Sequence, residues 1–206
     1  MRFISLVLAT AVVVPVAARA QGQDTLSLLG RSTISLGLGL TGTRSATAGV
    51  GEVSSHTTGQ VGAISFSHWV RPTVAIEISA AALNADESAS GGHAHANVLT
   101  PVLFGLSVSP RALALTTSLR PYVSAAAGPY IHSVSDAFGG NASESVEAVP
   151  GARLAAGANW FVARHFVMGL EGNYHAVGKF DRPDAITENA SGFGMSLSFG
   201  FAWGGR

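Results

Sequence analysis

Six polar residues in the middle of this chain stand at alternate positions between apolar neighbours, and they are the best candidates for chemistry. They are Glu77, Arg153, Asn159, Glu171, Asn173 and His175. Alternate residues of a β-strand share one face, so we expect all six on a single enclosed face. An unpaired buried charge is costly, and we therefore expect Arg153 to pair with Glu77 or Glu171. The favoured interpretation is a structural polar cluster, with a narrow ion path and acid catalysis as alternatives.

Seven histidines raise the question of a metal site. His93 and His95 flank a single alanine, and on a strand such a pair would share one face, as zinc ligands often do. The stretch from Asn84 to Asn97 is polar, however, and we expect a loop there, as around His56. The prediction is no resident metal and no cofactor.

The residues that position these side chains follow a two-residue period, which is clearest at the end of the chain. Large apolar residues occupy one parity of the last segment: Phe193, Met195, Leu197, Phe199, Phe201 and Trp203. The other parity holds only glycine, serine and alanine. This predicts a strand with one thick apolar face and no charged face, which a bilayer would cover.

The same alternation predicts eight strands in all. They are Ser32–Thr41, Gly59–Val70, a strand starting at Val74, Val98–Val108, Pro121–Val134, Ala152–Phe161, Phe166–Val177 and the closing strand. Long polar connections are expected at Thr43–Thr58, Asn84–Asn97, Ser135–Val149 and Gly178–Ala190, whereas Arg71-Pro72 and Val162–His165 are short. Residues 110–119 fit either a long turn or the start of a strand. Connections that alternate in length indicate an antiparallel meander whose two ends differ.

Composition agrees with export and with one domain. Arg2, an apolar run from Phe3 to Val16 and Ala18-Arg19-Ala20 form the pattern of a secretory signal peptide over residues 1–20. A membrane anchor helix is the alternative, although the run is shorter than the ~20 residues that a span requires. The barrel domain would cover residues 21–206. The chain has no cysteine, so no disulfide framework is expected.

The charge balance argues against a nucleic-acid partner. Without Arg2 and Arg19, 10 basic residues face 12 acidic ones, and no basic stripe appears. Apolar residues make up 47% of the chain, yet no stretch after residue 20 could cross a membrane as a helix. Because only helices and closed barrels satisfy every backbone group in lipid, the predicted fold class is all-β, an eight-stranded antiparallel up-and-down transmembrane β-barrel. A soluble secreted β-barrel that binds a small apolar ligand is the alternative.

Three short motifs resemble the small bacterial outer-membrane β-barrel proteins of the opacity-protein and OmpW type. Residues 69–78 resemble the first periplasmic turn of that family, with Glu77 as its inward glutamate, Arg120-Pro121-Tyr122 resembles the start of its fifth strand, and Phe166–Tyr174 its seventh. The family commonly ends on an aromatic residue, whereas here Gly204-Gly205-Arg206 follows Trp203. The resemblance implies an outer-membrane location, contact with outer-membrane lipid and insertion by the barrel-assembly machinery.

An enzyme is the alternative from a different class, because some small outer-membrane barrels are lipid A deacylases with a histidine and a serine on the lipid-facing wall. His132, Ser133, Ser135 and Glu144 are the residues to consider. His132 differs in parity from both serines, so neither would share its face. We therefore expect no enzymatic activity and a monomeric barrel with a narrow, filled lumen, acting in envelope integrity or surface interaction. A narrow pore for small apolar solutes is a further alternative.

Overall fold

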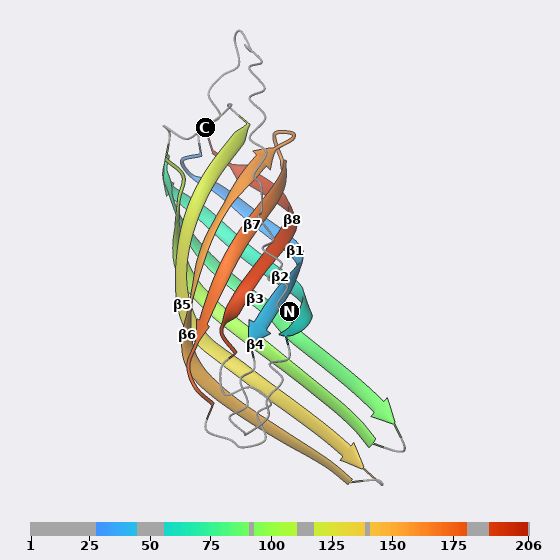
Figure 1. The fold of residues 1–206 in the computed structure, drawn as a ribbon. Helices are drawn as coiled ribbons and strands as arrows, with labels where there is room; N and C mark the ends of the chain where they lie inside the picture. Colours follow the sequence, from blue (N-terminus) through green and yellow to red (C-terminus); the bar gives the residue numbers. More distant parts are fainter. Residues whose placement is uncertain are drawn as a thin grey trace, which may run out of the picture.

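Eight antiparallel strands close into a single barrel in a computed structural model of the chain (Figure 1). The structure describes residues 28–44, 56–90, 93–110, 118–138, 141–180 and 190–205. The strands are β1 (Arg31–Arg44), β2 (His56–Arg71), β3 (Val74–Ser90), β4 (His93–Val108), β5 (Leu119–Phe138), β6 (Asn141–Phe161), β7 (Phe166–Val177) and β8 (Gly192–Gly204). The described residues include no helix long and apolar enough to cross a membrane. The predicted fold class is confirmed.

Pairing of the first strand with the last closes the barrel. Leu38 on β1 lies opposite Leu197 on β8, in a ladder that runs from Arg31 and Gly204 to Thr43 and Gly192. Each strand pairs with its neighbours in chain order, so no backbone edge is left open around the barrel wall.

Alternation sorts the residues of the wall into an apolar outside and a small or polar inside. On β8 the six large apolar residues are exposed on the outer face, Phe193 most of all at 74%. Leu38 on the neighbouring strand is 70% exposed, whereas Ala75, Glu77 and Ser79 on the inner face of β3 are buried. The wall therefore has the reverse polarity of a soluble protein.

The short connections lie together at one end, called the turn end below. β2 ends at Arg71 and β3 begins at Val74, so Pro72 stands in the turn where its missing N–H is harmless. Residues 162–165 join β6 to β7 at the same end, as predicted. β4 contains Pro101 with a buried side chain, and it confirms the strand expected from Val98.

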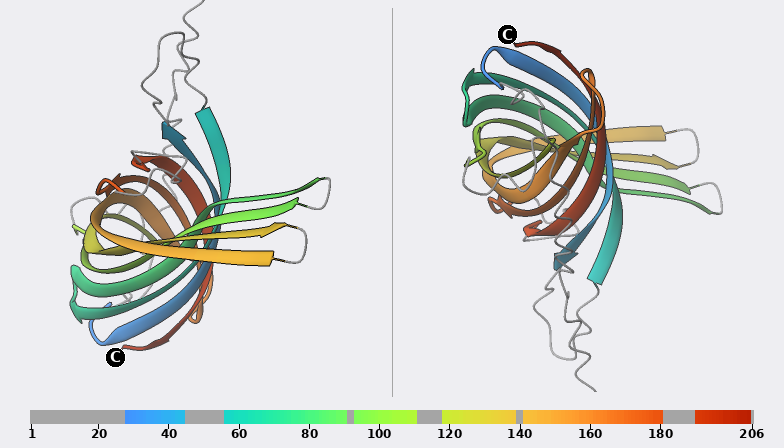
Figure 2. Two further views of the ribbon diagram at one scale, coloured as in Figure 1. Left: turned by 90° about the horizontal axis from the view of Figure 1, so that it is seen from below. Right: turned by 90° about the horizontal axis from the view of Figure 1, so that it is seen from above.

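Two predicted loops are wrong, because Asn84–Asn97 and Ser135–Val149 consist mostly of strand. β3 continues to Ser90, which pairs with His93, and β5 continues to Phe138, which pairs with Asn141. β4 and β5 are also paired as far as His93 and Phe138. These strand ends form a four-stranded sheet that projects beyond the barrel, called the projecting sheet below (Figure 2).

These two segments were predicted as loops because their residues are polar, but a strand that lies in water does not need apolar residues at alternate positions. A polar strand still satisfies its backbone groups when a hairpin neighbour supplies the ladder. Only the glycine pairs Gly91-Gly92 and Gly139-Gly140 separate these strands, and such pairs suit two-residue hairpin turns.

Other predicted boundaries move by a few residues. β1 runs to Arg44 and β2 begins at His56, so the connection expected at Thr43–Thr58 is shorter than predicted. Residues 45–55, 111–117 and 181–189 lie outside the described residues, as does the expected signal peptide at residues 1–20.

Candidate functional site

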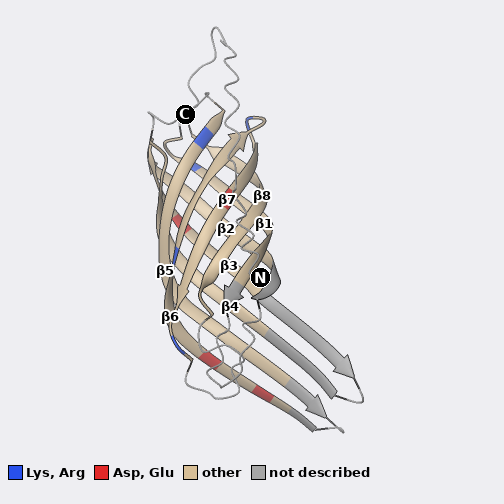
Figure 3. Ribbon diagram, in the orientation of Figure 1, with Lys and Arg blue, Asp and Glu red and all other residues tan. Residues whose placement is uncertain are grey.

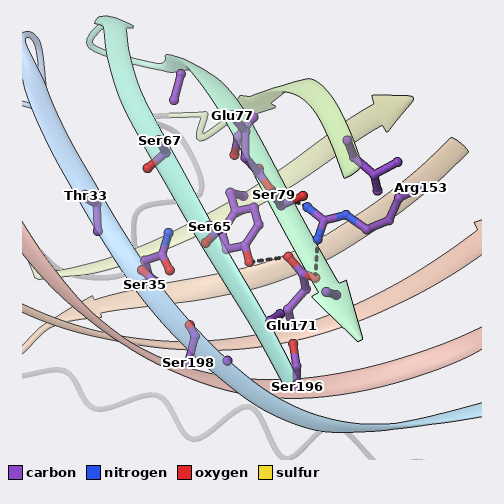
Figure 4. Close-up of a pocket in the computed structure, with 18 of the residues that line it drawn as sticks. Thr33, Ser35, Ser65, Ser67, Glu77, Ser79, Arg153, Glu171, Ser196 and Ser198 are labelled. Atoms are coloured by element: carbon purple, nitrogen blue, oxygen red, sulfur yellow. Dashed lines mark hydrogen bonds and ion pairs between the residues drawn. The ribbon is translucent and has the colours of Figure 1, made fainter. Parts of the chain in front are cut away.

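A cavity of about 100 Å³ lies in the middle of the barrel, and all eight strands contribute to its wall (Figure 4). The strands β1, β2 and β8 contribute small side chains, which leave the space open. These are mainly serines: Ser35, Ser65, Ser67, Ser196 and Ser198. The charged residues come from β3, β6 and β7, so the cavity is polar.

Arg153 is the centre of the charged side. Its guanidinium donates to the Glu77 carboxylate across the lumen, and its Nη1 lies 3.5 Å from Oε1 of Glu171. The three side chains are only 11–13% exposed. Two carboxylates therefore share one guanidinium in a space that is largely shielded from water, where ion pairs are strong and unpaired charges costly.

Two further donors support Glu171. The hydroxyl of Tyr122 donates to Oε2 at 2.8 Å, and Nδ2 of Asn173 donates to Oε1 at 3.1 Å. Both carboxylate oxygens of Glu171 are thus hydrogen-bonded. This arrangement places two carboxyl groups beside one guanidinium group.

The structure places all six predicted residues on the inner face. Glu77, Arg153 and Glu171 are in direct contact, and Asn173 joins them through Glu171. Asn159 and His175 line the same cavity. His175 is the ladder partner of Arg153 and contacts the hydroxyl of Tyr130 through Nδ1 at 2.8 Å.

Sequence reasoning missed the two tyrosines that complete the network. Tyr122 and Tyr130 stand at positions of the same parity on β5, and the prediction gave neither of them a role. The usable signal was their position on the enclosed face, because a buried tyrosine hydroxyl generally finds a hydrogen-bond partner.

Apolar clusters lie on both sides of this cavity along the barrel axis. The outer cluster, toward the projecting sheet, consists of Leu83, Leu99, Leu103, Ala126, Tyr130, Val149, Phe180 and Ala190. The inner cluster, toward the turn end, consists of Leu28, Trp69, Ala75, Phe161, Val167 and Ala202. Apolar side chains therefore lie on both sides of the polar network.

The residues of the enzyme alternative do not form a catalytic group. His132 is buried and its ring lies 5.2 Å from the ring of Phe180. Ser133 is its neighbour in the strand and lies on the other face, and Ser135 stands opposite Glu144 in the ladder.

The histidines considered for a metal lie at strand ends, and the structure does not describe the side chains of His56, His93 and His95. Among the described residues, no three His, Asp or Glu side chains form a group that could hold a metal ion.

The structure also contains one serine–histidine contact that was not predicted from the sequence. The Ser32 hydroxyl lies 2.9 Å from Nδ1 of His68, and the two residues are direct partners in the β1–β2 ladder. They share the parity of Ile34 and Phe66, which are exposed on the outer wall. Ser32 itself is only 8% exposed, so its hydroxyl is poorly accessible and the contact is best explained as structural.

Comparisons with known proteins give a likeness in fold. No protein-family model matches the sequence, and no curated protein matches it. Among solved structures, the outer membrane protein OprG from Pseudomonas aeruginosa is similar with a TM-score of 0.59 and 11% identity, covering 89% of this chain and 100% of that one.

Two other solved structures are similar to a comparable degree. Neisserial surface protein A matches with a TM-score of 0.57 and 14% identity over 84% of this chain and 96% of that one. Ail, the attachment invasion locus protein of Yersinia pestis, matches with a TM-score of 0.54 and 14% identity over 85% and 99%. At these identities the likeness shows the fold alone, which is that of small outer-membrane β-barrels.

Proposed function

We propose that the protein is an integral outer-membrane barrel that catalyses no reaction and presents the projecting sheet at the cell surface as an interaction surface. The observation that carries this proposal is the apolar outer wall. Its exposed residues include Leu36 at 64%, Leu38 at 70% and Phe193 at 74%, on adjacent strands β1 and β8. Such a continuous apolar surface needs lipid around it.

The filled lumen supports a structural role over transport. The Arg153 network spans the middle of the barrel, and apolar clusters lie above and below it. A narrow pore would require both apolar clusters to open. Maintenance of the envelope remains the other role open to such a barrel, with outer-membrane lipid as its partner and the barrel-assembly machinery needed for insertion.

The projecting sheet supports the surface role. In outer-membrane barrels the short turns face the periplasm and the longer connections face outward. Four strands here extend past the barrel, so a regular sheet would stand clear of the lipid (Figure 1). We place the turn end in the periplasm and consider the barrel monomeric, since no edge is left unpaired around its wall.

An epitope tag placed after Gly140 tests this orientation. The tag should bind antibody on intact cells, because it follows Phe138, whose pairing with Asn141 ends the β5–β6 ladder in the projecting sheet. A tag between Arg71 and Pro72 serves as the matched control and should bind only after the outer membrane is permeabilised. Reversed labelling, or equal labelling of both sites on intact cells, would contradict the proposal.

A further inference from the structure

The turn end of the barrel is strongly basic. Its described arginines are Arg31, Arg71, Arg120 and Arg164. No Asp or Glu occurs in the described residues there, which are 28–33, 69–76, 107–110, 118–123, 159–168 and 200–205. The acidic residues of β6, by contrast, lie toward the projecting sheet (Figure 3).

Two of these arginines lie close together, and none of the described carboxylates contacts them. The Arg31 guanidinium donates through Nη2 to the backbone carbonyl of Arg164. The positive charge of Arg164 also acts on Arg31, and that interaction between like charges is unfavourable. A pair of guanidinium groups in this position would be stabilised by an anion between or beside them.

Arg31 is also buried with one donor unused. The residue is 4% exposed, and its guanidinium carbon lies 4.9 Å from the centre of the Phe161 ring. Its Nε has no hydrogen-bond partner in the described structure. A buried donor without a partner is uncommon and often marks the place of an ion or water.

A third arginine, Arg120, also lies near the turn end and faces inward. Arg120 is paired with Asn159 on β6, two residues before Phe161, and it shares the inward parity of Tyr122. The guanidinium of Arg31 lies against Phe161, which belongs to the inner apolar cluster. This apolar surface lowers the local dielectric and strengthens the attraction of Arg31 for an anion.

From this arrangement we propose that Arg31 and Arg164, with Arg120 beside them, form a binding site for a phosphate group at the turn end. Guanidinium groups bind phosphate oxygens through paired N–H donors, and three of them suit a tetrahedral anion. The anion is either the headgroup of a phospholipid or a free phosphate. The lipid source rests on the proposed function, which puts this end beside the inner leaflet, whereas the site itself requires only the folded barrel.

The test uses the full chain folded in a maltoside detergent without phosphate. Inorganic phosphate is titrated at constant ionic strength, with chloride as the reference anion, and binding is followed by calorimetry and by the thermal midpoint. We expect phosphate to bind and to raise the midpoint above that in chloride. Arg31→Gln and Arg164→Gln should each weaken binding by tenfold or more.

Arg71→Gln is the matched control, because Arg71 is exposed on a different turn of the same end. It should change phosphate binding by less than twofold. Circular dichroism of each variant establishes that the barrel is folded. Equal stabilisation by chloride, or equal losses in Arg71→Gln and Arg164→Gln, would overturn the site.

A second arm distinguishes the source of the phosphate. Short-chain dihexanoyl phosphatidylglycerol is titrated in place of inorganic phosphate. Binding at least tenfold tighter, and lost in Arg164→Gln, identifies a lipid headgroup, whereas equal affinities identify a free phosphate. Because both arms use detergent, they succeed or fail independently of the antibody labelling that tests orientation.

Discussion

Arg153 on β6 and Glu77 on β3 are 76 residues apart in the chain and form an ion pair across the lumen. Three ladders separate their strands around the wall, so the pair connects opposite sides of the barrel. Glu171 on β7 contacts the same guanidinium. Ion pairs between side chains of β3, β6 and β7 therefore connect the barrel wall across the lumen.

Arg153→Met should destabilise the barrel by about 3–5 kcal/mol, because it leaves two carboxylates without their cation. Urea unfolding in lipid vesicles measures the loss. Adding Glu77→Gln to this variant should recover part of it, since only Glu171 then lacks a partner. The exposed Arg71→Met is the control and should change stability by less than about 0.5 kcal/mol. Strictly additive losses in the double variant would mean that Arg153 and Glu77 do not interact.

Leu197→Arg should cost about 2–4 kcal/mol if the outer wall lies in lipid, because a cation near the bilayer midplane is strongly unfavourable. Leu197 is 42% exposed and stands opposite Leu38, which is 70% exposed. Ala148→Arg is the matched control, because Ala148 is exposed on the part of β6 toward the projecting sheet. If arginine changes the free energy of unfolding in vesicles equally at the two positions, the outer wall does not lie in lipid.

Gly105→Ala should destabilise the barrel by about 1–3 kcal/mol through overpacking. A Cβ at Gly105 would clash with the carbonyl oxygen of Ala125 on the next strand, and the backbone cannot move away easily. Gly62→Ala is the control, because a Cβ there meets nothing within 4 Å. The same unfolding measurement should find Gly62→Ala neutral or slightly stabilising, and similar losses at both positions would contradict the packing argument.

The sequence predicted the barrel wall well because the apolar layer imposes a strict two-residue period. Leu36 and Leu38 alternate with glycines, and the same pattern on β8 identified the closing strand and its faces. The turn at Pro72 was equally clear, because proline cannot continue a paired strand.

The ends of the strands toward the projecting sheet could not be predicted in the same way. Residues such as Asp86 and Ser143 are paired in ladders that leave the apolar layer, where polarity no longer distinguishes strand from loop. The glycine pairs at Gly91 and Gly139 carried the missing signal.

The sequence predicted which residues of the polar cluster face inward, but it did not predict which of them contact one another. Their alternate positions predicted that Glu77, Arg153 and Glu171 face the lumen. The tilt and stagger of the strands, however, decide which of these side chains come into contact across a barrel. The contact of Arg31 with Arg164 depends on the same closure, because β1 reaches the β6–β7 turn only in the folded barrel.

The lumen should conduct no ions in the wild-type protein, and opening it should require changes at two levels. The outer and inner apolar clusters block the axis in series, with Tyr130 central to the first and Trp69 to the second. Either Tyr130→Ala or Trp69→Ala alone leaves one constriction in place and should give no steady current in a planar bilayer. The double variant should show measurable current, since only the polar middle then remains. Leu38→Ala on the outer wall is the control and should stay silent. Steady current through the wild type, or through either single variant at the level of the double variant, would mean that the two clusters do not act in series.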